Sequence, residues 1–473
     1  MFARPQALLS IVLGFGLLGA GGEERVAQHP RAAPGRSGVV VMGRPTAVVA
    51  RAGAGARHTF EENTTQDPSA QNETTIAVDL HRPWNAVGGT NDYRFGDAQA
   101  GIAVTFDTGR SWRATTLDAL DTTLGKYDAQ GDPWVISYPG GPFYYSYIDF
   151  NRGDDKNRLC VARSDDGGLT WPQLGVVIDH AGAGPNDFED KELIAVDATG
   201  GAFDGNLYIA WTRYPAGDAE RVMFSRSVDG GATFSAPAQI SDSTLNYQGT
   251  SPAIGPGGEV YVAWYHNSTV ELDRSFDGGV TFGLDVVVSA INDISNPLPG
   301  AFFRLFSFPS LAVDRSGGPD DGNLYVVWAD ELGTGAGPDI LLTRSTNGGA
   351  TWSAPIRVSD DTNSSHQFFP AIDVDVDGRI TVFFLDQRNA PGTPLYDAYI
   401  TQSTDGGLTF RRNKRLTGVS SNSTLDGFGG GFIGDYSGVS VTRTHVFPYW
   451  CDTRPSNANA EGYVRRGLRW RPF

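Results

Sequence analysis

The chain has 473 residues, with 54 acidic and 37 basic side chains and a formal net charge of −17 at pH 7. A field of this sign repels polyanions, so it argues against nucleic acids and anionic membrane surfaces as partners. The 60 glycines and 27 prolines, in company with many Val, Thr, Phe and Tyr residues, favour short strands joined by turns, and no long amphipathic helix is evident.

The first segment has the layout of a secretory signal peptide. Arg4 precedes an almost unbroken apolar run from Ala7 to Ala20, which is too short to span a bilayer well. We therefore predict a signal peptide at residues 1–22, an Ala-, Gly- and Arg-rich linker at residues 23–56 and a folded domain at residues 57–473. The mature protein is expected to be secreted or at the cell surface, extracellular or periplasmic, without an integral membrane span.

Six copies of one short motif follow, roughly 60 residues apart. Each reads Ser or Thr, any residue, Asp or Asn, any residue, Gly, any residue, Thr or Ser, and an aromatic residue. The glycine permits a positive φ, the Asp and hydroxyl side chains can bond the amides of a turn, and the aromatic ring buries a large surface. We therefore expect each copy to close a hairpin. The copies are TFDTGRSW (Thr105–Trp112), SDDGGLTW (Ser164–Trp171), SVDGGATF (Ser227–Phe234), SFDGGVTF (Ser275–Phe282), STNGGATW (Ser345–Trp352) and STDGGLTF (Ser403–Phe410).

The segments between the motifs repeat as well. LIAVDATGGAFDGNLYIAWTRY (Leu193–Tyr214) and LAVDRSGGPDDGNLYVVWADE (Leu311–Glu331) are near duplicates, and each leads into a further strand and then the motif. The repeat gives four strands per unit, with the motif joining the third to the fourth. The first strands are expected near Thr75, Trp134, Leu193, Pro252, Pro309, Pro370 and Ser437.

Seven such units fit the chain, but the last one ends before a fourth strand can form. Residues 58–62, just ahead of the first unit, would supply that strand and close the ring, which removes exposed strand edges. We predict an all-β fold, a seven-bladed β-propeller of four-stranded antiparallel blades whose ring is closed by an N-terminal strand. A six-bladed ring is the alternative.

A second pattern, Asp-x-Arg, recurs where three of the second strands end. It places Arg94, Arg388 and Arg454 in units one, six and seven, which are neighbours in a closed ring. The loops that follow second strands open on the face opposite the motif turns. We hypothesise that the three guanidinium groups converge there on the carboxylate of an acidic sugar or another carboxylated ligand. The alternative is that each arginine is held by its own Asp, or by that of the next blade, to order the loop.

Connections into the first strands should reach the same face and line a concave mouth. The polar and aromatic candidates are Glu73, Asp190, Lys191, Glu192, Tyr247, Arg304, His366, Asp435 and Tyr436.

No cofactor or metal is expected. The run Asp373–Gly378 resembles the start of a calcium loop, but Phe384 stands where the bidentate Glu would be, so we interpret it as a hairpin. Zinc-ligand spacing, a phosphate-binding glycine loop and a strained serine elbow are absent from the sequence. Cys160 and Cys451 fall on non-adjacent units, so they are predicted to be packed thiols.

The repeated motif resembles the Asp box, or BNR repeat, of sialidase-like β-propellers, a superfamily that includes secreted bacterial sialidases and other glycoside hydrolases. Sialidases of this kind use three arginines on the substrate carboxylate, a Tyr nucleophile activated by a Glu, and an Asp acid/base. The resemblance implies Tyr436 as the nucleophile, Glu192 or Asp190 as its partner, and the three Asp-x-Arg arginines as the carboxylate clamp. This sequence departs from the pattern in two ways: it lacks the Arg-Ile-Pro motif, with only Gly43-Arg44-Pro45 near its start, and it predicts seven blades where sialidases have six.

Three functions therefore stay open. The first is a secreted sialidase-like propeller that binds and hydrolyses extracellular glycans, acidic sugars being favoured. The second is a non-catalytic glycan- or protein-binding surface propeller. The third is a polysaccharide lyase or endoglycanase, activities that the resemblance also implies because other seven-bladed propellers with this motif have them. Whether the chain is an enzyme is not decided by its sequence.

Overall fold

The computed structural model describes residues 61–298, 300, 303–332, 337–454, 456, 459–465 and 468–469. The predicted signal peptide, the predicted linker and residues 57–60 lie outside these ranges. The described residues form thirty strands and only two short helical turns, α1 (Leu117–Leu120) and η1 (Ser423–Leu425).

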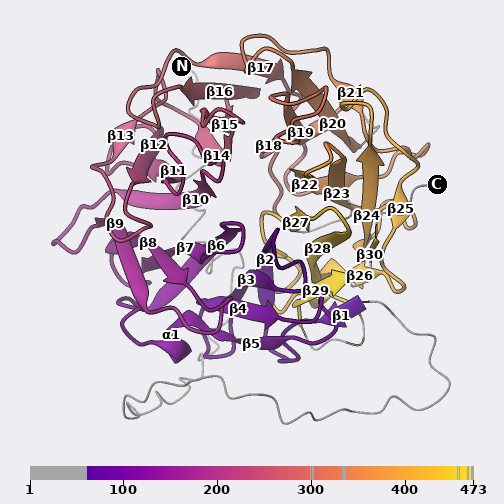
Figure 1. Cartoon of the computed structure of the whole chain (residues 1–473). Coiled ribbons are helices and arrows are strands. Elements are labelled where there is room, and N and C mark those ends of the chain that lie inside the picture. The colour runs from indigo at the N-terminus through magenta and orange to yellow at the C-terminus, as the bar shows by residue number, and fades with distance from the viewer. Residues whose placement is uncertain are drawn as a thin grey trace, which may run out of the picture.

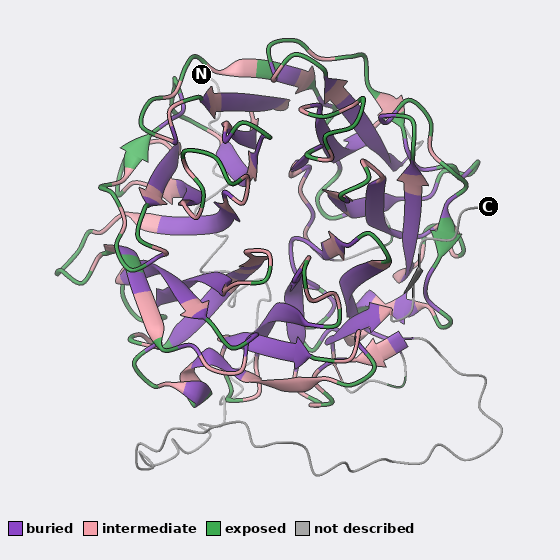
Figure 2. Ribbon diagram, in the orientation of Figure 1, coloured by how far each residue is buried: buried purple, intermediate pink, exposed green. Residues whose placement is uncertain are grey.

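Seven antiparallel sheets stand in a ring around a central channel, so the seven-bladed prediction is confirmed (Figure 1). In six blades the strands follow the chain from the channel outward, and the first strands of all seven blades line a channel cavity of about 480 Å³. Figure 2 shows the strands largely buried and the exposed residues gathered in the turns.

The first three blades hold β2 (Gln71–Val78), β3 (Ala86–Asp92), β4 (Gln99–Thr105) and β5 (Arg113–Thr116); β6 (Ala129–Ser137), β7 (Phe143–Phe150), β8 (Asn157–Ser164) and β9 (Gln173–Asp179); and β10 (Phe188–Val196), β11 (Leu207–Tyr214), β12 (Arg221–Ser227) and β13 (Ala238–Gln239). Blades four and five hold β14 (Tyr247–Ile254), β15 (Val260–His266), β16 (Thr269–Ser275) and β17 (Val286–Ala290); and β18 (Ser310–Val313), β19 (Leu324–Glu331), β20 (Pro338–Ser345) and β21 (Ile356–Arg357). Blade six holds β22 (Gln367–Val374), β23 (Ile380–Asp386), β24 (Leu395–Ser403) and β25 (Lys414–Arg415), with β26 (Ser421–Asn422) added on β24.

The seventh blade joins the two ends of the described chain. It contains β27 (Gly438–Val441), β28 (His445–Asp452) and β29 (Glu461–Arg465), and β1 (Glu61–Asn63) supplies its fourth strand. β1 runs antiparallel to β29, with Glu61 opposite Arg465 and Asn63 opposite Tyr463, and a short β30 (Leu468–Arg469) pairs with β28. Figure 1 shows the indigo and yellow strands side by side at this closure. Where the structure describes the predicted closing segment, at Glu61 and Glu62, it is a strand, and the strand continues to Asn63.

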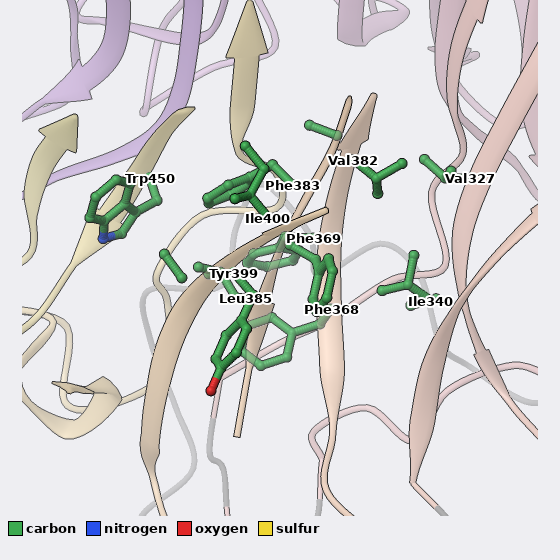
Figure 3. Packing of buried hydrophobic residues seen from close by; sticks show 14 of the residues in the cluster. Val327, Ile340, Phe368, Phe369, Val382, Phe383, Leu385, Tyr399, Ile400 and Trp450 are labelled. Atoms are coloured by element: carbon green, nitrogen blue, oxygen red, sulfur yellow. The ribbon is translucent and has the colours of Figure 1, made fainter. Parts of the chain in front are cut away.

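Large aromatic side chains fill the spaces between blades. Trp211, Trp264, Trp328 and Trp450 occupy matching positions in the second strands of four blades, and none of the four is exposed. Figure 3 shows Phe383 of blade six facing Trp450 of blade seven, with ring centroids 6.2 Å apart. Burial of such rings supplies the hydrophobic contact that holds neighbouring blades together.

Each of the six motifs joins the third strand of a blade to the fourth, as the sequence predicts. In the third copy, the Ser227 hydroxyl donates to Asp229 at 2.7 Å, and the Thr233 hydroxyl donates to the same carboxylate at 2.6 Å. These hydroxyl bonds and the Thr233 amide lower the pKa of Asp229 to about 2. Equivalent hydrogen bonds recur in four other copies. In the fifth copy, the Ser345 hydroxyl donates to Asn347, whose amide nitrogen donates to the Thr351 hydroxyl. The motif acids therefore hold turns closed and face away from the opposite mouth of the ring.

Candidate functional site

In five blades the first strand has a β-bulge near its start, where two of its residues lie opposite a single residue of the second strand. The first bulge residue has a positive φ in every case: 53° at Glu73, 54° at Asp132, 55° at Lys191, 70° at Gly249 and 49° at Phe369. A non-glycine residue in this region is strained by about 1–3 kcal/mol, and such bulges re-aim side chains next to functional sites. In blades one, two and three the strained residue is charged, so the bulges direct three charges towards one mouth of the ring.

These residues meet in a cavity of about 320 Å³, which we call the charged cavity. Its volume lies at the lower end of the range for small-ligand sites. The charged residues that line it are Glu73, Asp132, Arg152, Asp190, Lys191, Arg304 and Asp435. Its aromatic walls are Tyr93, Phe150, Phe428 and Phe432. Five of the mouth residues named from the sequence, Glu73, Asp190, Lys191, Arg304 and Asp435, therefore line one cavity.

Three carboxyl groups from three consecutive blades lie together in the lining of this cavity. Asp132 is the common partner of Glu73 and Asp190. Burial, reinforced by the charge of Asp132, raises the pKa of Glu73 and the pKa of Asp190 well above their usual values. Neighbouring carboxylates that cannot all ionise retain a proton between them. A carboxyl group whose pKa is raised in this way can hold the proton that a general acid donates.

Amide donors hold this cluster in place. The Asn91 side chain donates to Glu73 at 2.8 Å, and the Gln248 side chain donates to Asp190 at 3.2 Å. The backbone N–H of Lys191 donates to Asp132 at 3.0 Å. Each carboxyl group thus has a donor from a different strand, and all of them are fixed relative to the cavity.

Two cations stand beside the carboxyl groups. The Nζ atom of Lys191 lies 3.1 Å from the centre of the Tyr436 ring, and burial lowers the pKa of this lysine although the surrounding carboxylates oppose the shift. Arg304 binds Asp435 through two nitrogens, at 2.9 and 2.6 Å. Burial alone would lower the pKa of Arg304, but Asp435 raises it. The cavity therefore offers positive groups to an anionic part of a ligand.

Of the three residues predicted to be catalytic, Asp190 and Glu192 lie on β10 and the charge of Glu192 acts on Tyr436, but the three have different surroundings. Asp190 lines the charged cavity. Tyr436 is buried and donates its hydroxyl proton to the carbonyl of Pro133 at 2.8 Å. Burial, together with carboxylates that include Glu192, raises the pKa of Tyr436 well above its usual value. Glu192 is fully buried, its carboxyl group accepts no hydrogen bond from another described residue, and burial raises its pKa strongly. Neither Tyr436 nor Glu192 lines the charged cavity.

Each of the three Asp-x-Arg arginines is held by its own Asp. Arg94 forms a two-pronged contact with Asp92, the shortest at 2.6 Å. In the same way, Asp386 holds Arg388 at 2.7 Å and Asp452 holds Arg454 at 2.7 Å. Each Asp also accepts the backbone N–H of its own arginine.

Further partners differ from blade to blade. Arg388 also contacts Asp360 at 2.5 Å, and Arg454 contacts Glu61 of β1 at 2.8 Å. Among the described residues that line the charged cavity, Arg94, Arg388 and Arg454 do not occur. These contacts are those of the second interpretation given above, in which each Asp orders its own arginine and loop.

Asp132 is the residue that sequence reasoning missed. It precedes the predicted strand start at Trp134 by two residues, as Lys191 precedes Leu193 and Glu73 precedes Thr75. Aligning the first strands on these starts would have placed the three charges at one position of the repeat. Within the described ranges, no helix is long and apolar enough to cross a membrane. In the same ranges no group of three or more His, Cys, Asp or Glu side chains is arranged to hold a metal ion.

No protein-family model matches the sequence, and neither does any curated protein. Solved structures do match. A Hadza microbial sialidase has 15% identity and a TM-score of 0.46, over 78% of this chain and 73% of that one. An α-L-arabinanase of Penicillium chrysogenum in complex with arabinobiose has 11% identity and a TM-score of 0.46, over 68% and 93%. An ulvan lyase bound to a GlcA–Rha3S repeat has 12% identity and a TM-score of 0.49, over 85% and 94%.

Proposed function

We propose that this protein binds a glycan in the charged cavity and cleaves a glycosidic bond there by proton transfer. The observation that carries the proposal is the convergence of Glu73, Asp132 and Asp190, from three adjacent blades, in a sugar-sized cavity with aromatic walls. Glu73, Asp132 and Lys191, which also line this cavity, are held at positive φ. Stability alone does not explain these three charged residues, since glycine would be less strained at each position.

In this proposal a carboxyl proton moves to the glycosidic oxygen as the bond to the anomeric carbon breaks. Asp190 is the preferred donor because it lines the cavity and its pKa is raised, first by burial and then by Asp132. A second carboxylate of the cavity then accepts a proton from the water that attacks the anomeric carbon. Paired carboxyl groups commonly divide the acid and base roles in this way. In the alternative, Tyr436 rather than water attacks the anomeric carbon and Glu192 accepts its proton. The support for it is the Glu192 charge that acts on Tyr436 and the contact of the Tyr436 ring with Lys191, a residue of the charged cavity.

An acidic sugar is the substrate class that we favour. Lys191 and Arg304 are lining cations whose charges act on Glu73 and Asp190, and either can face a sugar carboxylate. A clamp by Arg94, Arg388 and Arg454 would first require each of them to release its Asp partner. We therefore assign recognition of the sugar carboxylate to Lys191 and Arg304.

The test is turnover of a glycan panel by the purified protein. The panel contains sialyllactose, hyaluronan, polygalacturonate and arabinan, and new reducing ends are measured. We expect Asp190→Asn and Asp132→Asn to lower the rate about 10²–10⁴-fold, the usual contribution of a general acid. Asp165→Asn, an exposed acid on the motif face, is the matched control and should keep the wild-type rate. Equal rates in all four proteins would refute the assignment, and tight binding without turnover would indicate a non-catalytic glycan-binding propeller.

A polysaccharide lyase is the second candidate, and Lys191 is the reason. Burial lowers the pKa of this lysine, so it is better suited than an exposed lysine to accept the proton next to a uronate carboxylate. Elimination leaves an unsaturated product that absorbs ultraviolet light, whereas hydrolysis does not. The absorbance of the uronate digests therefore separates the two reactions.

We further propose that the chain is exported and belongs with the sialidase-like Asp-box propellers. The support is the apolar run that ends at Ala20 and the six motif turns with their shared hydrogen bonds. Expression of the full chain in a bacterial host, followed by N-terminal sequencing of protein outside the cytoplasm, tests export. A mature protein that keeps residues 1–22 would contradict it.

A further inference from the structure

A second cavity of about 250 Å³ lies next to the charged cavity, between blades three, four and five. We call it the aromatic cavity, after the five rings that line it: Tyr214, Tyr247, Tyr265, Phe306 and Phe308. The two phenylalanine rings stack on each other, with centroids 4.8 Å apart and planes 11° from parallel.

The two cavities share a wall. Gln248 lines both of them, and its side-chain amide donates to Asp190 in the charged cavity. The segment before β18 also contributes to both cavities: Arg304 lines the charged cavity, and the next residue, Leu305, lines the aromatic cavity. A ligand that filled both would have to extend past Gln248.

The bulge of blade four explains why the second cavity differs from the first. Its positive-φ residue is Gly249, where blades one to three carry charged residues. A Cβ atom at this position would come within 2.5 Å of the Phe308 ring. Glycine is therefore required for the ring to pack onto the strand, and an aromatic wall replaces the charge.

The chemistry of the aromatic cavity suits an uncharged sugar. Aromatic rings pack against the C–H face of a sugar, while polar groups around them bond its hydroxyls. Glu220, Asn246, Asp293 and Asn296 supply such groups, and the described lining contains no Lys or Arg. An anionic sugar would meet two acidic side chains there without a cation beside them.

Ser307 is a candidate hydrogen-bonding residue for a ligand of the aromatic cavity. It lines the aromatic cavity, is buried, and its hydroxyl has no hydrogen-bond partner among the described residues. A buried hydroxyl without a partner destabilises the free protein by about 1–3 kcal/mol. A sugar hydroxyl could satisfy it once the Ser307 side chain turns towards the cavity.

We propose that the two cavities form one groove for a glycan chain of at least two units, with a neutral sugar in the aromatic cavity beside the sugar held in the charged cavity. The inference rests on the proposed function, since it assumes that the charged cavity takes a sugar. It goes further by naming the ligand: a glycan segment in which an acidic sugar is joined to a neutral sugar.

The experiment compares calorimetric binding of matched short and long probes by wild type, Ser307→Ala and Phe308→Ala. The probes are N-acetylneuraminic acid with sialyllactose, and glucuronic acid with a hyaluronan tetrasaccharide. Ser423→Ala is the matched control, because Ser423 is also a buried hydroxyl without a partner among the described residues but lies outside both cavities.

In at least one pair we expect wild type to bind the longer probe about tenfold more tightly than the shorter one. Ser307→Ala should weaken only the longer probe, about fivefold, which corresponds to one hydrogen bond. Phe308→Ala should remove most of the gain from chain length, and Ser423→Ala should behave as wild type. Thermal unfolding of Ser307→Ala should be unchanged or slightly higher, which separates lost binding from lost folding.

The outcomes distinguish the two proposals. If short and long probes bind equally well, or if Ser307→Ala and Phe308→Ala leave the gain intact, the groove is refuted while glycan binding in the charged cavity stands. If wild type binds none of the probes, acidic-sugar binding fails and the groove fails with it.

Discussion

Glu192 offers the sharpest test of how the site is built. Its carboxyl group is fully buried on β10 and accepts no hydrogen bond from another described residue. Three residues earlier on the same strand, Glu189 is equally buried but accepts hydrogen bonds from Trp211, Arg213 and His180. Replacing each by methionine, a side chain of similar length, should therefore have opposite effects on stability.

The sign follows from the pKa. Burial raises the pKa of Glu192 well above its usual value, so the folded protein retains a proton that the unfolded chain releases above about pH 4.3. Stability then falls as pH rises from about 4.3 through the folded-state pKa. Glu192→Met lacks this loss, and it also removes a buried polar group whose penalty is about 1–3 kcal/mol. We expect the variant to be more stable than wild type by that amount at pH 8, with a smaller gain at pH 4.

Glu189→Met should instead lose about 3 kcal/mol, because it leaves the half-buried Arg213 without its main partner and the buried Trp211 indole N–H without an acceptor. Urea unfolding followed by tryptophan fluorescence at pH 4 and pH 8 measures both differences. The reasoning is refuted if Glu192→Met is less stable than wild type at pH 8, or if its gain is the same at both pH values. If Glu192 also serves Tyr436 in catalysis, the stabilised variant will be less active, a common trade-off at functional sites.

Three further predictions concern the ring and its turns. Glu61→Ala removes the buried contact between β1 and Arg454 and should lower the unfolding free energy by about 2–3 kcal/mol, whereas a loss below 0.5 kcal/mol in urea titrations would contradict the closure. Arg388→Ala should lower the melting temperature but leave sugar affinity within twofold, and a tenfold loss of affinity at unchanged stability would instead support the arginine clamp. Asp229→Ala should lower the unfolding free energy by about 1 kcal/mol at pH 7. Because the Thr233 hydroxyl and amide lower the pKa of Asp229 to about 2, the difference between wild type and variant should fade between pH 4 and pH 2. A difference that persists at pH 2 would show that the Asp229 charge is not its source.

Much of the fold could be predicted because it repeats. The near duplicates Leu193–Tyr214 and Leu311–Glu331 set the strand template, and the position of residues 58–62 in that template predicted the closing strand that β1 forms. The bulges could not be predicted in the same way. They depend on pairing with the second strand, and an extra residue in a bulge leaves no periodic signature in the sequence.

The site was predicted less completely, and for a physical reason. The Asp-x-Arg pattern is compatible with an arginine that reaches a ligand and with one that folds back on its own Asp. Arg454 folds back on Asp452, because the Asp carboxylate that accepts the Arg454 backbone N–H also lies within reach of its guanidinium group. Asp132 has no distinctive motif, and its importance arises only when Glu73 and Asp190 are brought beside it by neighbouring blades.

The central claim is that a glycan binds where the three carboxyl groups meet. The most direct measurement is a crystal structure of the protein soaked with the hyaluronan tetrasaccharide or sialyllactose, whichever binds more tightly. We expect sugar density within hydrogen-bond distance of Asp190 and Lys191, extending past Gln248. Density at the motif turns or at Arg388, with the charged cavity empty, would contradict the account.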